Sequence, residues 1–330
     1  MLSKLKLSIL IGSFLILAAL PMITEAIDEP FYIDLMARVM IFSIAAMSLD
    51  FILGYGAMIS FGHALYLGLG TYAVGIMAHY EVTNGWLQLL VCISGTAFIA
   101  FILGLISLRT SGIYFIMITL AFAQMLFFLF VSLEQFGGDD GMSIDRADFL
   151  VIDLYEPLRL YFLIWVALAL VALGLMFIVR SRFGVTLRAI KSNESRVEAM
   201  GLVPLHFKIT SYVISAVICG LAGTLFASWQ EYVSPDIMHW TRSGEIMIII
   251  ILGGLGTLAG PLLGAIVFLL LEESLPMLLG AVAPAYAENW MILFGPLLIM
   301  VVLFGRGGLV GVIAARHQSA SNLKRGKAGQ

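Results

Sequence analysis

Few residues in this 330-residue chain have the types and spacing that chemistry requires. Gly254, Gly256 and Ala259 fit the spacing of a dinucleotide fingerprint, in which glycines let the backbone approach a pyrophosphate. Nothing in the flanking sequence supports the soluble βαβ unit that this fingerprint requires. No GxxxxGK(S/T) motif occurs in the chain, so the sequence contains no phosphate-binding loop of its own. We therefore expect the chain to bind no nucleotide.

Metal-ligand and catalytic patterns are equally sparse. Cys92 and Cys219 lie in apolar runs, where cysteine usually serves as a small buried hydrophobe. The tripeptide Asp139-Asp140-Gly141 resembles part of a calcium loop, but the alternating acids and the terminal Glu of such a loop are missing. No nucleophile stands at a spacing that would pair it with a base, which argues against an intramembrane enzyme. We therefore expect no catalysis, no metal and no cofactor in this chain.

The composition indicates an integral membrane protein. Hydrophobic residues make up 61% of the chain and charged residues only 12%, and the mean hydropathy is +1.03. Soluble domains average about 25% charged residues. Apolar runs of about 20 residues have the length of helical spans, whereas the strands of a membrane barrel alternate over about ten residues. The sequence therefore predicts an all-α polytopic membrane protein.

About ten transmembrane helices are predicted, all within one domain over residues 1–330. The first apolar run follows Lys4 and Lys6 and ends at Ile23. We expect it to be retained as a helix, because the residues after it form a poor cleavage site. A glycine-proline interruption near Gly260-Pro261 divides 243–279 into two short spans. The other predicted spans are 33–53, 58–80, 87–107, 112–133, 158–179, 208–229 and 288–304.

The distribution of Lys and Arg orients these spans, because basic residues near span ends are retained in the cytoplasm. With ten spans, the loop 180–208 and the tail 305–330 lie inside with most of the basic residues, and both termini are cytoplasmic. The basic residues left outside are Arg38, Arg146, Arg159 and Arg242. Within the second span, Arg38 near the start and Asp50 near the end are both expected to reach the membrane interfaces.

The loop 180–208 is the strongest candidate for a binding segment. It is basic and lies between two apolar spans. Its local signals predict two short helices: two apolar residues share one face, a polar residue can cap the second helix, and a glycine followed by a proline can end it. The residues that give these signals are, in order, Leu187, Ile190, Ser192 or Asn193, Gly201 and Pro204. The loop is either a connection held by lipid headgroups or a docking helix for a cytoplasmic partner, since its charged and apolar residues alternate as in a groove-binding helix.

Two sets of residues within the predicted spans are candidates for the transport pathway and for helix packing. Polar residues in small-residue spans either face a pathway or hydrogen-bond between helices, and the second role is favoured for the histidine. These candidate pathway residues are Ser60, His63, Thr119 and Gln124. Two overlapping small-xxx-small pairs predict a close helix crossing. The residues of these pairs are Gly256, Gly260 and Gly264.

Several stretches between about 60 and 311 occur in an order typical of one family. They are SFGHALYLGLGTY at 60–72, LRTSGIYFIMITLAFAQ at 108–124, FGGDDGMSI at 136–144, LRAIKSNESRVEAMGL at 187–202, ISAVICGLAGTLFA at 214–227, ILGGLGTLAGPLLGA at 251–265 and FGRGGLVG at 304–311. In this ordered combination the chain resembles the permease subunits of bacterial branched-chain amino-acid ABC transporters, of the LivM type.

The resemblance implies a subunit of the bacterial inner membrane that forms half of a pore and hydrolyses no ATP. The implied architecture is that of the ten-helix, type II-like importers. The implied partners are a related permease, two cytoplasmic ATPases that carry ATP and Mg, and an external solute-binding protein. Loop 180–208 corresponds to the family's coupling loop, and Met200 stands where an alanine is frequent. The implied ATPase-coupling residues are Arg188, Asn193, Glu194, Glu198, Ala199 and Gly201.

Two other functions stay open on the sequence. An importer of urea or short-chain amides would use the same machinery, and no motif quoted above separates it from an amino-acid importer. An ion-coupled secondary carrier would need intramembrane acids near the midplane, often at broken helices. Glu272 and Glu273 form the close acidic pair within a predicted span, but they lie near its outer end. The sequence therefore disfavours the carrier.

Cysteines introduced singly at Asp140 and Ser192 are expected to react with a membrane-impermeant thiol reagent from opposite sides, Asp140 from outside. The reason is that the charge asymmetry places the acidic loop 134–157 and the basic loop 180–208 on opposite sides of the membrane. Labelling of intact cells and of inverted vesicles measures this. Accessibility of both positions from the same side would overturn the predicted topology.

Overall fold

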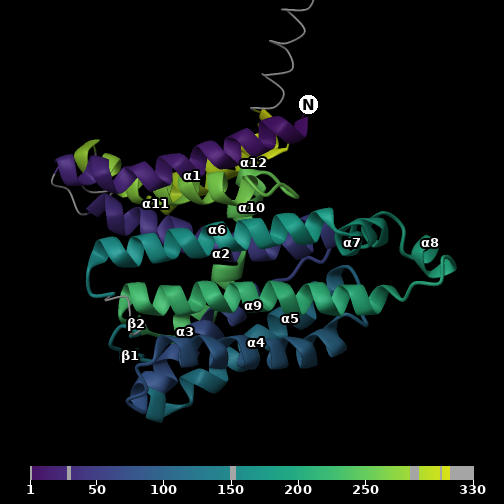
Figure 1. The fold of residues 1–330 in the computed structure, drawn as a ribbon, viewed down its shortest axis with the longest axis horizontal. Coiled ribbons are helices and arrows are strands. Elements are labelled where there is room, and N and C mark those ends of the chain that lie inside the picture. Colours follow the sequence, from purple (N-terminus) through teal and green to yellow (C-terminus); the bar gives the residue numbers. More distant parts are fainter. Residues whose placement is uncertain (1, 28–30, 149–153, 283–289, 305–306, 313–330) are drawn as a thin grey trace, which may run out of the picture.

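The computed structural model describes residues 2–27, 31–148, 154–282, 290–304 and 307–312. These residues are almost entirely helical, and Figure 1 shows the long helices running across one bundle. A two-stranded antiparallel sheet, β1 (Met142–Ser143) with β2 (Tyr232–Val233), and the 3-10 helices η1 (Glu134–Phe136) and η2 (Pro235–Met238) lie in the connections. The α-helices are α1 (Leu2–Ile27), α2 (Phe31–Gly56), α3 (His63–His79), α4 (Gly85–Ser107), α5 (Ile113–Val131), α6 (Pro157–Arg180), α7 (Arg182–Ser192), α8 (Glu194–Ala199), α9 (Pro204–Gln230), α10 (Trp240–Gly253), α11 (Gly260–Val282) and α12 (Met291–Phe304).

Helices occupy all ten predicted spans, and α7 and α8 lie in the loop 180–208. Among the described residues, six helices are long and apolar enough to cross a membrane: α2, α4, α5, α6, α9 and α11. Helices α3, α10 and α12 have 17, 14 and 14 residues, and the apolar part of α1 covers Ser8–Met22. The chain is therefore an all-helical, multi-pass membrane protein, while the count of ten spans stays a prediction.

Helix α2 lies at the centre of the bundle. Its apolar residues occur on every face, a pattern that leaves no side for solvent. In the apolar stretch of α2 that is long enough to cross a membrane, 94% of the residues are buried. Helices α6, α9, α10 and α11 all contact α2. By contrast, only 22% to 28% of the residues are buried in the corresponding stretches of α4, α5 and α6, and these helices expose large apolar side chains. These outer faces suit contact with lipid or with another membrane chain.

Helices α3 and α9 approach each other at backbone distance. A side chain at Gly70 of α3 would strike the carbonyl of Gly220, and a side chain at Gly223 of α9 would strike the carbonyl of Leu67. Small residues let the two backbones touch, and the resulting dispersion contacts replace the hydrophobic driving force that is absent between helices in lipid. The glycines of the predicted third span therefore serve close packing.

The predicted interruption of 243–279 is present, but the two helices that it separates differ in length. Helix α10 ends after 14 residues, whereas α11 runs for 23 residues and is not a second short span. In the turn 254–259 between them, Gly254 and Gly256 have φ angles of +124° and +68°, which glycine adopts without strain. Side chains at Gly260 and Gly264 would strike backbone carbonyls of this turn and of α10. Helices α10 and α11 therefore cross at backbone distance.

The acidic loop between α5 and α6 is pinned to the bundle. Strand β1 pairs with β2 so that Met142 lies opposite Val233, and Arg146 forms an ion pair with Glu231 at 2.5 Å. The carbonyl of Asp148 accepts a hydrogen bond of 2.8 Å from the first residue of α4. In Figure 1 the β1–β2 sheet lies at the end of the bundle opposite α7 and α8. The described part of this loop is thus tied to α4 and α9.

Replacing Gly264 by Leu is expected to destabilise the bundle, because the new Cβ would strike the carbonyl of Ile249 at the α10–α11 crossing. Overpacking of this kind costs about 1–3 kcal/mol, so thermal unfolding in detergent should begin at a lower temperature than in the parent. Gly174→Leu in α6 is the matched control, since nothing lies within 4 Å of a Cβ at Gly174. Equal unfolding temperatures for the two variants would contradict the close crossing.

Candidate functional site

Loop 180–208 contains the two short helices that its local signals predict. Asn193 caps α8, because its side-chain oxygen accepts a hydrogen bond of 2.9 Å from the N–H of Arg196. Gly201 has a φ of +83°, the left-handed conformation that commonly ends a helix. Pro204 then occupies the first turn of α9, where its missing N–H leaves no hydrogen bond unmade. The sequence therefore specifies both the helices and the turn between α8 and α9.

The inward face of α7 and α8 is apolar. Leu187 and Ile190 of α7 are 0% and 4% exposed, and Val197 of α8 is 2% exposed. Phe183 of α7 also packs against Phe207 of α9, with ring centroids 5.6 Å apart. Burial of these side chains attaches the loop to the bundle through hydrophobic contact.

Two cations of α7 bind the ends of spans. Arg188 donates a hydrogen bond of 3.2 Å to the carbonyl of Val179 in α6, and Lys191 donates one of 2.6 Å to the carbonyl of Gly54 in α2. Carbonyls in the last turn of a helix lack helical partners, and the helix dipole favours cations there. Arg188 therefore points toward α6, unlike the other predicted coupling residues, which lie on α8 and its flanks.

The outer side of the loop is formed by α8 and the turn after it. Figure 1 shows α7 and α8 projecting from one end of the bundle. Glu194 forms an ion pair with Lys208 of α9 at 2.6 Å, while Glu198 and Ala199 are exposed and Met200 is 72% exposed. A large apolar side chain beside a carboxylate on a projecting helix is a surface suited to a protein partner.

His63 lies at the start of α3 and is fully buried. Its Nε2 atom lies 2.9 Å from the hydroxyl of Ser48 and 3.3 Å from the hydroxyl of Ser215. Its ring meets that of Tyr66 edge to face, with centroids 5.8 Å apart. These contacts connect α2, α3 and α9 by hydrogen bonding between helices. Contact of His63 with a transported solute stays a prediction.

The other candidate pathway residues are divided between two places. Ser60 is buried in the connection from α2 to α3, and the hydroxyl of Thr119 accepts a hydrogen bond of 3.2 Å from the N–H of Phe61 in the same connection. Ser60, His63 and Thr119 are thus brought together where α3 begins. Gln124 lies further along α5, and its buried Nε2 has no hydrogen-bond partner among the described residues. The buried Nδ1 of His63 likewise has no hydrogen-bond partner among the described residues.

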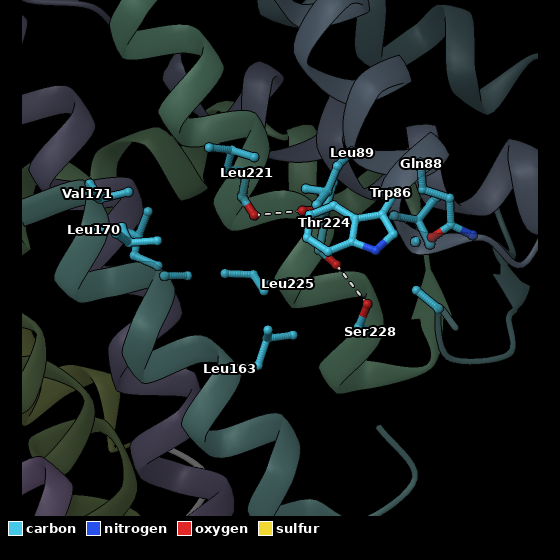
Figure 2. Close-up of a pocket in the computed structure, with 15 residues that line it drawn as sticks. Trp86, Gln88, Leu89, Leu163, Leu170, Val171, Leu221, Thr224, Leu225 and Ser228 are labelled. Atoms are coloured by element: carbon cyan, nitrogen blue, oxygen red, sulfur yellow. Dashed lines mark hydrogen bonds between the residues drawn. The ribbon is translucent and has the colours of Figure 1, made fainter. Parts of the chain in front are cut away.

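An apolar cavity of about 280 Å³ lies between α4, α6 and α9. Figure 2 shows Leu163 of α6 on one side of it and Trp86 on the other. Thr224 and Ser228, which line it, donate their hydroxyl hydrogens to the carbonyls of Leu221 and Thr224 at 2.8 and 3.1 Å. None of the described residues that line the cavity is charged. The cavity therefore suits hydrocarbon better than a zwitterionic amino acid, whose two charges would lack partners there.

Asp50 is a candidate functional residue that sequence reasoning missed. Its side chain was expected to reach the interface, but it is 2% exposed, and its Oδ1 accepts a hydrogen bond of 2.8 Å from the N–H of Gly256. The expectation was wrong because the bundle covers every face of α2 at this level. The available signal was the charge itself, since an ionisable residue within a span usually has a specific partner. Arg38 has one too, an ion pair with Glu272 at 3.1 Å.

Comparison with known proteins identifies relatives along most of the chain. Residues 31–302 match the family described as branched-chain amino acid transport system / permease component. The chain is 27% and 28% identical to the high-affinity branched-chain amino acid transport system permease proteins LivM of Salmonella typhimurium and Escherichia coli, over 89% of this chain and 73% of each relative. It is 23% identical to a probable LivM permease of Methanocaldococcus jannaschii, over 84% of this chain and 94% of that protein. No solved structure matches the chain.

Gly201→Val is expected to loosen the turn after α8. A φ of +83° strains a β-branched residue, and the open space around the position excludes a clash as the cause. The left-handed conformation costs an ordinary residue about 1–2 kcal/mol. Limited trypsin digestion of the purified chain should therefore cut after the exposed Arg196 faster in this variant than in the parent. Gly201→Asn is the matched control, because asparagine tolerates positive φ. Equal cleavage of the two variants would show that the turn does not depend on φ.

Proposed function

The chain belongs to the family of permease components of branched-chain amino acid transport systems, and we propose that it is the membrane-spanning subunit of an ATP-driven importer of branched-chain amino acids. The observation that carries this proposal is the family match over 31–302, which takes in all six long apolar helices and loop 180–208. The named activities of the LivM relatives support the choice of solute.

In this proposal the chain forms half of the translocation pathway and a related permease forms the other half. The exposed apolar faces of α4 and α5 supply surface for such a membrane partner. Two cytoplasmic ATPases bind ATP and Mg, since this chain has no phosphate-binding loop. An external binding protein delivers the solute. The chain itself performs no catalytic step.

The proposed location is the bacterial inner membrane, with both termini in the cytoplasm. Support comes from the charges at the two ends of the bundle. The end with α7 and α8 carries Arg188, Lys191 and Arg196, whereas the loop that contains β1 carries Asp139 and Asp140. Because basic residues near span ends are retained inside, α7 and α8 face the cytoplasm and β1–β2 faces the exterior.

Loop 180–208 acts as the coupling loop, and α8 with its flanks docks onto an ATPase. Its docking residues are Asn193, Glu194, Glu198, Ala199 and Gly201, with Arg188 acting from α7. Closure of the two ATPases on ATP displaces α8, and the contacts of α7 with α2 and α6 carry that displacement to the spans. Import then depends on stabilising one of two membrane conformations relative to the other.

Solute selectivity belongs mainly to the external binding protein in this mechanism. Differential stabilisation of two conformations drives the solute through without tight binding in the pathway. Ser60, His63, Thr119 and Gln124 are the residues of this chain proposed to line the pathway. His63 hydrogen-bonds to Ser48 of α2, while the hydroxyls of Thr119 and Ser60 accept hydrogen bonds from backbone N–H groups of the α2–α3 connection. A change in helix packing would therefore alter the groups they present.

Reconstitution of the chain in proteoliposomes tests the function. With the related permease, the ATPases, the binding protein and ATP, we expect accumulation of leucine, isoleucine or valine. The chain alone should show no ATP hydrolysis and no accumulation. Uptake by the chain alone in an ion gradient would replace the proposal with a secondary carrier. Uptake of urea or a short-chain amide in place of leucine would retain the mechanism and change the solute.

Glu198→Arg tests the docking surface in the same assembly. The variant reverses an exposed charge on α8, so it should weaken ATPase docking without changing insertion or pairing with the sister permease. Co-purification of the ATPase is the measurement. Asp139→Arg, the same charge reversal in the loop at the opposite end, is the matched control and should retain the ATPase. Full retention in both variants would mean that α8 is only a tether.

A further inference from the structure

The last two turns of α2 are bonded on one side to α7 and on the other to the turn 254–259. We propose that Asp50 and Lys191 are positioning residues that connect the coupling loop to the α10–α11 turn through these two turns of α2. The inference rests on the proposed function, because it assigns these two residues a role in converting ATPase movement into a change of the membrane helices.

The first connection joins α7 to α2. The Lys191 ammonium donates a hydrogen bond of 2.6 Å to the carbonyl of Gly54. This carbonyl belongs to the last turn of α2, where backbone acceptors have no helical partner and the dipole favours a cation. A charge-assisted hydrogen bond of this kind is stronger than a neutral one. Displacement of α7 along the membrane therefore pulls on the end of α2.

The second connection joins α2 to the turn 254–259. Asp50, one helical turn before Gly54, is 2% exposed and accepts a hydrogen bond of 2.8 Å from the N–H of Gly256. A charged side chain is costly to bury without a partner, so its position depends on this bond. The bond also satisfies a backbone N–H that the broken helix leaves unpaired.

Backbone contact reinforces the second connection. A Cβ built on Gly54 would lie 2.6 Å from the Cα of Gly256 and 2.6 Å from its nitrogen. The backbones of α2 and the turn are thus in direct contact, with no side chain between them to absorb a shift. Gly54 takes part in both connections, because its carbonyl binds Lys191 while its Cα abuts Gly256.

The turn 254–259 is suited to transmit movement because its own hydrogen bonds fix its shape. The hydroxyl of Thr257 donates to the carbonyl of Gly254 at 2.7 Å and accepts from the N–H of Gly260 at 3.1 Å. Helix α10 ends just before this turn and α11 begins just after it. Displacement of the turn therefore moves these two helix ends together.

The test uses the complete reconstituted importer and measures solute imported per ATP hydrolysed. Asp50→Leu and Lys191→Met remove the two hydrogen bonds, whereas Asp50→Asn and Lys191→Arg keep an acceptor and a donor of similar reach. We expect import per ATP to fall about tenfold in the first pair, as loss of one charge-assisted hydrogen bond allows, and to stay within about twofold of the parent in the second pair.

Two controls separate this role from general stability. Arg109→Met removes an exposed cation from the α4–α5 connection on the same side and should leave the ratio unchanged. The double variant Asp50→Leu with Lys191→Met should lose no more than the worse single variant, because both bonds belong to one linkage. Additive losses, or an unchanged ratio in Lys191→Met, would overturn the proposal. Should Asp50→Leu fail to assemble, the two Lys191 variants decide the matter alone. A parent complex that does not import with ATP would instead refute the proposed function.

Discussion

Every backbone N–H and C=O inside a bilayer needs a partner from the protein, because hydrocarbon offers none. This requirement accounts for the polar groups around α2. The break between α10 and α11 is closed by the hydroxyl of Thr257 and by the carboxylate of Asp50. The carbonyls at the ends of α2 and α6 that lack helical partners accept hydrogen bonds from two cations of α7. The loop outside the spans thus supplies hydrogen-bond donors that the ends of the spans need.

The same constraint separates two kinds of helix. Those at the centre, α2, α3 and α9, bring backbones together through glycine and join buried polar groups such as His63, Ser48 and Ser215. Those at the margin, α4, α5 and α6, present wide apolar faces that the chain does not cover. A permease subunit needs both kinds, since its core must keep its arrangement while its margin meets lipid and a sister chain.

Local patterns predicted the elements well and their contacts poorly. Helix positions followed from apolar runs, and the turn after α8 followed from Gly201 and Pro204, because these signals act within a few residues. The contacts of Lys191 with Gly54 and of Asp50 with Gly256 join residues 137 and 206 positions apart. No short-range pattern encodes such pairs, so the sequence predicted a basic loop over 180–208 but no contact for Lys191 within it. The pathway residues share this difficulty, because side-chain direction in a bundle depends on neighbours from distant spans.

The contact between Gly54 and Gly256 also limits how the sequence can drift over evolution. Gly54 has no space for a methyl group, and Gly256 has a φ of +68° that disfavours most other residues. A larger residue at either position cannot be accommodated by a smaller residue at the other, since glycine has no side chain to reduce. Ordinary core positions escape this limit by exchanging volume with a partner. The two glycines therefore form a point where compensating changes are unavailable.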